Sequence, residues 1–598
     1  MLEIEKIIEY LSENRSISVR DKLRSKKNTD LPLIQPRSGV GSFDKMFKML
    51  KSFEQSGIPD ILTLTIDSYT RLGHFDKASA LKHSDLLNGF PLVSHGYVRC
   101  RQLSNELKSP LQVRHGSPIS ERLFLHSMAA GITAFEGGGI SYNLPYSKNH
   151  SLEDSLQSWK RIDSWCGMAA AKGIFIDREL FGTLTAVLVP PSLSISISVL
   201  EGLLAISQGV KCLSIAYPET GNESQDIASL MSIKDIMRKY TAEMFGNEVA
   251  ESIEIYSVLH QFMGPFPSNP IAATELIKQG ARIARLGFAD KIIVKTYNEA
   301  VCIPSVEDNI SSMKIVQEEM LLCELTRNNS LDITFEQELI VKEVDELLAP
   351  VLTNKEGLID SIVKAFEIGL LDVPFAPSIY AKGKILPARD SGGAIRYLDK
   401  GGLSLSRETM QMNHNLIGSK RDLHWKERLY NDIFYFSDHK PKHTNNASYR
   451  NKSVRVYQSS DIKRTAILMG AESDAHAVAN YVVEKVLIEH KFKVTNLGVC
   501  TSLQELNSAL DKEDDLSIIV IGSTNGHALS DMEGLQSILT SKNITCPIVL
   551  GGRLSIDGSS EESTRRELAS HGITDYFDSI ESFDSFLHQY FKASKTVA

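Results

Sequence analysis

The stretch ILTLTIDSYTR (residues 61–71) places a run of apolar and β-branched residues directly before a polar segment that ends in an arginine. The same pattern returns in LQVRHG (111–116) and in KIIVKTYNE (291–299). The candidate strands of this region are Ile61–Ile66, Leu111–Val113, Thr183–Val189, Cys212–Ala216, Ile253–Leu259 and Lys291–Lys295. Helical stretches separate them, which is typical of βα units with a parallel sheet. Because the region exceeds roughly 250 residues, we predict a closed (β/α)8 TIM barrel rather than an open sheet.

The chain has 598 residues, which is too many for one hydrophobic core. The predicted organisation is an N-terminal segment with a short helix and a polar connector (1–30), the barrel with a mostly helical extension (31–436), a linker (437–460) and a second domain (461–598). The linker is predicted because its first part, SDHKPKHTNNASYRNKS, is polar and almost free of aliphatic residues. Within the extension, ILPARDSGGAIRYL (385–398) is predicted to be a loop.

Strands and helices alternate again in the second domain, which predicts a doubly wound, flavodoxin-like or Rossmann-like α/β fold. Such sheets bind ligands at the carboxyl ends of their strands, and the first strand there ends before Asp474 and His476. An imidazole at this place could ligate a metal, with the carboxylate fixing its tautomer. A surface histidine is the alternative that these two residues leave open. Further candidates at the following strand ends are Ser523, Thr524, Gly551 and Gly552.

Composition narrows the class of protein. A net charge of −9 argues against a nucleic-acid partner, which would favour a basic surface. The seven cysteines form no CxxC pair, so neither a cysteine zinc site nor a disulfide framework is indicated, and a reduced cytoplasmic setting fits. The N-terminal residues do not resemble a secretory signal, and no apolar run reaches the roughly 18 residues that a membrane span needs. We therefore expect no membrane partner.

Three arginines follow strand-like segments of the barrel: Arg37, Arg71 and Arg114. Each alone reads best as a surface or salt-bridge residue. A guanidinium, however, holds a carboxylate through two parallel hydrogen bonds. Three of them at one barrel mouth could therefore bind both carboxylates of a small dicarboxylic acid.

The segment EGGGISYNLPYSKN (136–149) supplies a carboxylate and two phenols, Glu136, Tyr142 and Tyr146. This combination suits a substrate ammonium group, and a glycine-rich turn with packing tyrosines is the alternative. Lys295 and Glu299 stand four residues apart just beyond a strand, where an ordinary helical ion pair is the simpler interpretation.

The C-terminal motifs, DAHAVA, the loop with Ser523 and the GG pair, resemble those of the cobalamin-binding domain of mutases and of methionine synthase. The resemblance implies that His476 is the lower axial cobalt ligand and that Asp474 supports it. Two departures stand out. Ala479 replaces a glycine of the family's DxHxxG pattern, and DYFDSIESF (575–583) stands where the family has an APGT-like loop. Both concern the nucleotide tail of the cofactor more than the axial ligand.

The barrel resembles the epsilon subunit of glutamate mutase over about residues 33–400. The matching segments, in the family's order, include QPRSGV, TIDSYTR, LLNGFP, LQVRHGSP, EGGGISYNLPYSKN and VKTYNEAVCIP. The resemblance implies a carboxylate-binding claw made by the three arginines, and it makes Glu136 the catalytic acceptor for the substrate amino group, with both tyrosines nearby. It also implies that Lys295 and Glu299 hold the adenosyl ribose and that Asn88 contacts the cofactor.

Together the two resemblances imply an adenosylcobalamin-dependent isomerase, of the methylaspartate mutase type, that interconverts L-glutamate and (2S,3S)-3-methylaspartate by a radical mechanism. The barrel and cobalamin subunits are separate chains in familiar members of the family and would be joined here. Three alternatives stay open: a mutase for a related dicarboxylic amino acid, a non-catalytic cobalamin-binding protein, and a C-terminal domain that binds a flavin. A homodimer formed through the barrel is one of the assemblies that we consider.

Overall fold

The computed structural model describes residues 2–14, 17–26, 31–83, 87–183, 188–299, 304–325, 331–353, 357–437, 464–513, 515–524, 526–552, 554 and 561–593. The chain divides into two compact units, Met1–Asp438 and His439–Ala598, called here the N-terminal and C-terminal units. The predicted linker, apart from Ser437, lies outside the described residues. No helix of the described ranges combines the length and the apolarity that crossing a membrane requires.

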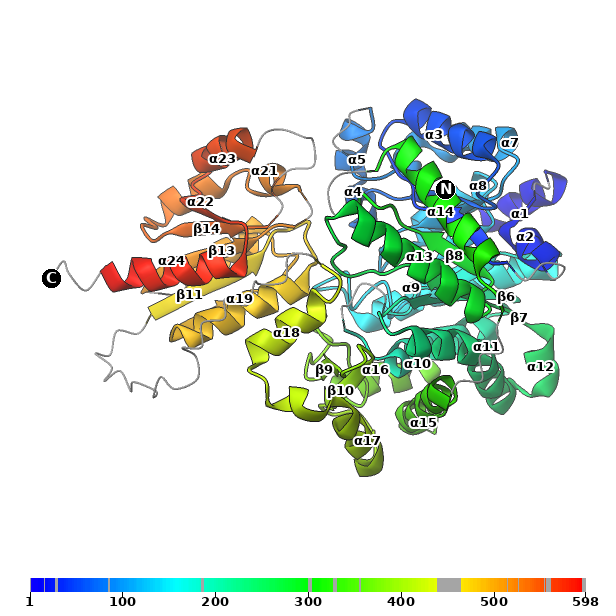
Figure 1. The fold of residues 1–598 in the computed structure, drawn as a ribbon. Coiled ribbons are helices and arrows are strands. Elements are labelled where there is room, and N and C mark those ends of the chain that lie inside the picture. The colour runs from blue at the N-terminus through cyan, green and yellow to red at the C-terminus, as the bar shows by residue number, and fades with distance from the viewer. Residues whose placement is uncertain are drawn as a thin grey trace. The chain divides into compact units, whose positions relative to one another are not determined.

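The N-terminal unit contains the eight parallel strands of a nearly closed barrel (Figure 1). They are β1 Leu33–Pro36, β2 Leu62–Thr65, β3 Leu111–Arg114, β4 Ala134–Glu136, β5 Asp177–Leu180, β6 Cys212–Pro218, β7 Glu254–His260 and β8 Lys291–Val294. Their order, β1-β8-β7-β6-β5-β4-β3-β2, pairs β2 through β8 with their sequence neighbours and β1 with β8. Between β1 and β2, the carbonyl of Ile34 accepts from the amide of Asp60 (2.9 Å), and that of Ser38 accepts from Thr65 (2.8 Å). The predicted barrel is thus present.

Helices surround this sheet. Those up to the last barrel strand are α3 Phe43–Ser56, α4 Ser68–Arg71, α5 Phe75–Leu81, α6 Leu92–His95, α7 Tyr97–Glu106, α8 Glu121–Ala129, α9 Leu152–Ala171, α10 Pro191–Ser207, α11 Glu223–Phe245, α12 Asn247–Ser252 and α13 Pro270–Leu286. The extension that follows has α14 Val306–Leu322, α15 Leu331–Leu352, α16 Leu358–Ile368, β9 Leu386–Arg389, β10 Ile395–Asp399, α17 Arg407–Ile417, the 3-10 helix Gly418–Asp422 and α18 Trp425–Ile433.

One predicted barrel strand, 183–189, is not found in those of its residues that the structure describes. Within 183–189, residues 184–187 lie outside the described residues, and Thr183 and Leu188 are in turns. The strand of this region is β5, whose sequence is DREL and whose four residues are all buried. Charged residues do not predict a buried strand, because burial of a charge is unfavourable without a partner. Here the partners come from other elements of the barrel.

The N-terminal segment forms two helices, α1 Ile4–Glu13 and α2 Val19–Ser25, so part of the predicted polar connector is helical. Ser18 begins α2 with a reciprocal capping box to Asp21. Val19 and Leu23 of this helix pack with apolar residues at or beside the amino ends of the barrel strands. The helix therefore closes the end of the barrel opposite to the strand ends where function is expected.

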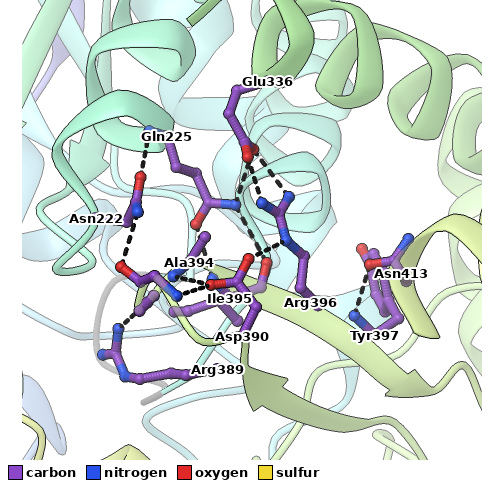
Figure 2. A network of polar contacts seen from close by, with 12 residues as sticks. Asn222, Gln225, Glu336, Arg389, Asp390, Ala394, Ile395, Arg396, Tyr397 and Asn413 are labelled. Carbon is purple, nitrogen blue, oxygen red and sulfur yellow. Dashed lines mark hydrogen bonds and ion pairs between the residues drawn. The ribbon is translucent and has the colours of Figure 1, made fainter. Parts of the chain in front are cut away.

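The predicted loop at 385–398 is a β-hairpin, formed by β9 and β10. Figure 2 shows how its turn is held: the Asp390 carboxylate accepts from the amides of Gly392 (2.9 Å) and Ala394 (3.0 Å), and Gly393 adopts a φ of 88°. Glycine tolerates this conformation best. The serine and glycines that suggested a loop are in fact the turn of the hairpin.

The hairpin is fixed to α11 of the barrel and to α15 of the extension by a buried polar network (Figure 2). Arg396 donates to Glu336 of α15 (2.9 Å) and to Asp390 (2.9 Å). Gln225 of α11 exchanges two hydrogen bonds with the backbone of Ile395 (2.9 and 3.2 Å). Because each buried charge has a partner, the extension is a structural part of this unit rather than a separate module.

The C-terminal unit contains a five-stranded parallel sheet with the order β12-β11-β13-β14-β15. Its elements are β11 Arg464–Gly470, α19 Ala477–Glu489, β12 Phe492–Asn496, α20 Leu503–Leu510, β13 Leu516–Gly522, α21 Ala528–Asp531, α22 Leu535–Ser541, β14 Ile548–Gly551, α23 Glu561–Ser570, β15 Asp575–Phe577 and α24 Ile580–Ala593. One core joins alternate strand residues such as Ile467 and Ile519 to α20, α21, α22 and α23. The carboxyl ends of β11, β13 and β14 lie together, as their register requires.

Candidate functional site

The first candidate site lies at the carboxyl ends of the barrel strands. Arg114 is the last residue of β3 and Glu136 the last of β4, and their side chains form an ion pair with Nε to Oε2 at 2.5 Å. The hydroxyl of Tyr142 donates to the other carboxylate oxygen of Glu136. All three side chains are buried, and Tyr146 lies against Tyr142 with ring centroids 5.3 Å apart. The predicted carboxylate and phenols are thus brought together with one of the arginines.

The pKa of Glu136 is subject to opposing effects. Burial raises the pKa of Glu136, Arg114 opposes the rise, and the nearby carboxylate of Glu179 adds to it. A buried carboxylate with two donors from the protein keeps further lone pairs for a third donor. Chemically, this carboxylate can accept a further hydrogen bond from an ammonium group.

A second group at the mouth joins β1 to the end of β8. Glu299 accepts from Arg37 (2.8 Å) and forms an ion pair with Lys295 (3.2 Å). Burial would raise the pKa of Glu299, but the two cations outweigh it and lower the pKa to about 2. The simple helical ion pair of the sequence is therefore part of a three-residue cluster that includes a predicted substrate arginine. Arg37 is held by Glu299, whereas Arg114 is held by Glu136.

Arg71 differs from the other two arginines. It ends the short helix α4 beyond β2, and its buried Nε has no hydrogen-bond partner among the described residues. A buried donor without an acceptor is costly unless a ligand supplies one. Asn88 lies close by in the chain fold, because its Oδ1 accepts from the amide of Ser68 in the same helix (3.1 Å). Asn88, the predicted cofactor contact, and Arg71, the predicted carboxylate contact, are thus both associated with the short helix α4 beyond β2.

Sequence reasoning missed the buried chain of polar groups behind Arg114. His260 at the end of β7 accepts from Arg114 through Nδ1 (3.4 Å) and meets Glu179 of β5 through Nε2 (3.1 Å). Glu179 in turn accepts from Lys291 of β8 (2.6 Å). Burial lowers the pKa of His260 to about 4, so this ring is neutral and donates from Nε2. The signal that could have identified these residues is the appearance of charged residues inside barrel strands.

The glycine-rich turn after Glu136 is clamped from two sides, which the sequence also did not reveal. Arg178 donates to the carbonyls of Phe135 (2.7 Å) and Gly137 (3.0 Å). Glu201 of α10 accepts from the amides of Ile140 (2.8 Å) and Ser141 (2.7 Å).

There is no room for a side chain in this turn. A Cβ added to Gly138 would stand 2.1 Å from the Glu201 carboxyl carbon. The clamp therefore fixes the turn between Glu136 and Tyr142, and Glu201 is a positioning residue for that pair. Likewise, a Cβ at Gly116 would stand 2.8 Å from the ring of Tyr146, so the RHG segment seats that tyrosine.

The second candidate site lies at the carboxyl edge of the C-terminal sheet. His476 precedes α19, and its Nδ1 donates to Asp474 (2.5 Å). Thr524, beyond β13, donates to the same carboxylate from its amide (2.5 Å) and from its hydroxyl (2.9 Å). Burial alone would raise the pKa of Asp474, but these hydrogen bonds outweigh it and leave that pKa below its ordinary value.

The exposure of the pair decides what it can do. The side chain of Asp474 is 3% exposed and that of His476 is 63% exposed. The buried anion therefore fixes the Nδ1–H tautomer, and Nε2 carries the lone pair that a metal ligand needs. The arrangement fits a metal ligand held by a buried carboxylate, and a surface histidine paired with that carboxylate remains the alternative.

The other predicted residues of this edge are adjacent. The Oγ of Ser523 is buried and has no hydrogen-bond partner within the part of the chain that the structure describes. Gly551 ends β14, and Gly552 follows with a φ of 116° at a place where a Cβ would stand 2.1 Å from the carbonyl oxygen of Ser523. Ala479, in place of a glycine, is exposed in the first turn of α19. An unsatisfied hydroxyl beside a glycine edge fits a large polar ligand such as the tail of cobalamin.

Comparison with known proteins addresses the N-terminal unit. Residues 14–435 match the family model described as methylaspartate mutase E chain. The glutamate mutase epsilon subunit of Desulfitobacterium hafniense is 39% identical over 417 residues, which are 68% of this chain and 85% of that protein. Those of Escherichia coli O157:H7 (39% over 396 residues; 65% and 81%) and Haloarcula marismortui (35% over 428 residues; 69% and 86%) are also similar.

Proposed function

The chain belongs to the methylaspartate mutase E chain family and is therefore a mutase, and from this premise we propose that it interconverts L-glutamate and (2S,3S)-3-methylaspartate with adenosylcobalamin as its cofactor. The observation that carries the proposal is the buried group of Arg114, Glu136 and Tyr142 at the carboxyl ends of two barrel strands. It combines a carboxylate binder with an ammonium binder, which is what an α-amino dicarboxylic acid requires.

The barrel residues would act by binding and orientation. The substrate carboxylates would be bound by Arg37, Arg71 and Arg114. The Nε of Arg71, which has no acceptor among the described residues, would donate to one of these carboxylates. Glu136 would accept from the ammonium group while Tyr142 continues to donate to it. Lys295 and Glu299 would hold the ribose of the cofactor. Burial of these groups would exclude water. Binding in a fixed orientation would remove the translational and rotational freedom of the substrate before the reaction, which lowers the entropic part of the barrier.

The C-terminal unit would carry the cofactor. Its parallel strand order is the one found in flavodoxin-like sheets, and the ligand edge of such sheets is where Asp474 and His476 lie. His476 would ligate cobalt, with Asp474 and Thr524 fixing the ring. Ser523 and the two glycines would line the tail. When bound, adenosylcobalamin supplies a carbon–cobalt bond whose homolysis starts radical chemistry.

We also propose that the two units are a barrel subunit and a cobalamin subunit fused in one chain. The family match ends at residue 435, just before the boundary between the units at 438 and 439. The C-terminal unit has its own sheet and core. A homodimer through the barrel is compatible with this arrangement, and sedimentation of the purified chain would measure it.

A proton NMR assay tests the proposed reaction. Glutamate, adenosylcobalamin and the purified chain should yield the new methyl doublet of methylaspartate, and the reverse reaction should remove it. Turnover of another dicarboxylic amino acid but not of glutamate would support the related-substrate alternative. Cobalamin binding without turnover of any such acid would support a non-catalytic role. An absorption spectrum typical of a flavin would overturn the cofactor assignment.

A further inference from the structure

A second group of metal-ligating side chains lies in the C-terminal unit, apart from the candidate cobalamin site. His490 follows the last residue of α19, whereas Asp584 and His588 belong to α24. The Nε2 of His490 is 2.7 Å from Oδ1 of Asp584, and the two imidazole rings meet edge to face with centroids 4.4 Å apart. One ligand atom from each of the three side chains lies within 4.8 Å of the others.

The spacing of these residues suits a metal ion. Asp584 and His588 are four residues apart, which puts them on one face of α24, and His490 meets that face from another helix. Two imidazole nitrogens and one carboxylate oxygen are the donors that Zn²⁺ prefers when cysteine is absent. Ligands of a tetrahedral Zn²⁺ are roughly 3.3 Å apart, as follows from bond lengths near 2.0–2.2 Å. The pair at 2.7 Å would need to open by about half an ångström. The Nδ1 of His588, which is 3.8 Å from Oδ1 of Asp584 and hydrogen-bonded to the Asp584 carbonyl (2.9 Å), would need to leave that carbonyl and approach by a similar distance, or the ring would bind through Nε2.

The exposed fractions of the three side chains fit a metal site that the protein encloses only in part. The side chain of His490 is 12% exposed, that of Asp584 31% and that of His588 56%. A metal ion there would be held from the protein side by three ligands and would keep at least one position for water.

We propose that His490, Asp584 and His588 form a Zn²⁺ site that joins α24 to α19. The site is separate from the proposed cobalt ligand, because His476 and His490 stand at opposite ends of α19, whose 13 residues span roughly 20 Å. It therefore does not depend on the proposed function of the chain. Its consequence is that Zn²⁺ stabilises the C-terminal unit, since a ligand that binds only the folded state opposes unfolding.

The experiment is calorimetric titration of the full chain with ZnCl₂ in a His476→Ala background, which removes the exposed imidazole of the His476–Asp474 pair. We expect one Zn²⁺ per chain, with affinity reduced by more than about tenfold in His490→Ala and in His588→Ala. His571→Ala, a histidine of the same unit outside the cluster, should bind like the background. Zn²⁺ should also raise the melting temperature of the C-terminal unit in the background and in the His571 variant, and EDTA should reverse the rise.

Two outcomes would overturn the proposal. One is the absence of Zn²⁺ binding in the background, which would leave the cluster as an ordinary ion pair. The other is equal binding and equal thermal shifts with and without His490 and His588. Because His588 is exposed and its truncation removes little packing, its variant keeps the test valid even if His490→Ala folds poorly.

Discussion

The barrel mouth and the carboxyl edge of the C-terminal sheet each contain a buried carboxylate, but the two carboxylates have different kinds of partner. At the mouth, Glu136 is buried and already paired with Arg114. At the edge, Asp474 is equally buried, but its partner His476 points outward. A buried ion pair suits a small ligand whose own charged groups replace some of the contacts between protein side chains. An exposed imidazole held by a buried carboxylate suits a large ligand that binds at the surface. The comparison predicts that changes at the edge affect cofactor binding and changes at the mouth affect turnover.

The largest effect is expected for His476→Ala. Without the imidazole, cofactor binding and turnover should fall to background, because the proposed axial ligand is lost. The control is His571→Ala. Electron paramagnetic resonance of the cob(II)alamin form provides a direct measurement, since nitrogen-15 labelling of histidine should change the hyperfine splitting of the wild type. Unchanged splitting would remove His476 from the site and with it the contrast between the two regions.

Cutting the chain tests whether the two regions work as one enzyme. Separately expressed fragments 1–436 and 454–598 should restore activity when mixed, and that activity should rise with fragment concentration. At dilutions where the intact chain is fully active, the loss should be on the order of 10²- to 10⁴-fold, because covalent linkage raises effective concentration. Activity independent of concentration, or fragments that are both insoluble, would argue against two separable units.

At the mouth, Arg71→Lys keeps the charge but loses the two-pronged guanidinium. A lost charge-assisted hydrogen bond should lower kcat/KM for glutamate by about 10- to 150-fold. The cobalamin spectrum should stay unchanged, because the cofactor is assigned to the other unit. Arg238→Lys, at an arginine that is 51% exposed on α11, should be nearly silent. Wild-type rate and half-saturation in Arg71→Lys would show that this arginine does not bind the substrate.

A milder change at the edge is Asp474→Asn, which keeps the shape of the side chain but removes its charge. Supporting groups of this kind typically contribute about 10- to 100-fold to metal affinity. We expect cofactor affinity to fall within that range while the kcat of the saturated enzyme changes less. The exposed Asp511→Asn is the control. An effect on kcat alone, with normal affinity, would contradict the division of roles between edge and mouth.

The smallest effect on turnover is expected for Glu201→Gln, which changes the clamp on the glycine-rich turn. Burial, opposed by hydrogen bonds from Ser141 and Ile140, raises the pKa of Glu201 from 4.5 to about 7. Because the folded-state pKa is the higher one, this group's contribution to stability is fully present below pH 4.5 and is lost as the pH rises through about 7. The variant should therefore show a shallower fall in melting temperature between pH 5 and 7.5 and a modest loss of turnover.

Thermal melts of the wild type, of Glu201→Gln and of the exposed control Glu243→Gln across this range make the measurement. Parallel curves for all three proteins would mean that Glu201 does not titrate there. Normal turnover in the Glu201 variant would mean that the glycine-rich turn keeps its shape without the clamp.

Local pattern was sufficient wherever the chain alternates apolar strands with amphipathic helices. The sequence placed Arg114 at the end of a strand, where the structure has it as the last residue of β3. It failed at β5 and at the hairpin around Asp390, where polar residues suggested loops. In both places the polar groups are buried, and some of their partners are distant in the sequence, as Lys291 is from Glu179 and Glu336 is from Arg396.

The sequence by itself determined the βα rhythm, the two-unit organisation that we inferred and the residue types of the candidate sites, because hydrophobic periodicity and short motifs are local properties. Only the tertiary structure decided which charge meets which: Arg37 with Glu299, Arg114 with Glu136, and Glu179 with Lys291. The reason is physical. A buried charge is tolerated only beside a partner. The barrel brings such partners together from strands that are close in the chain, as for Arg114 and Glu136, or more than 100 residues apart, as for Glu179 and Lys291.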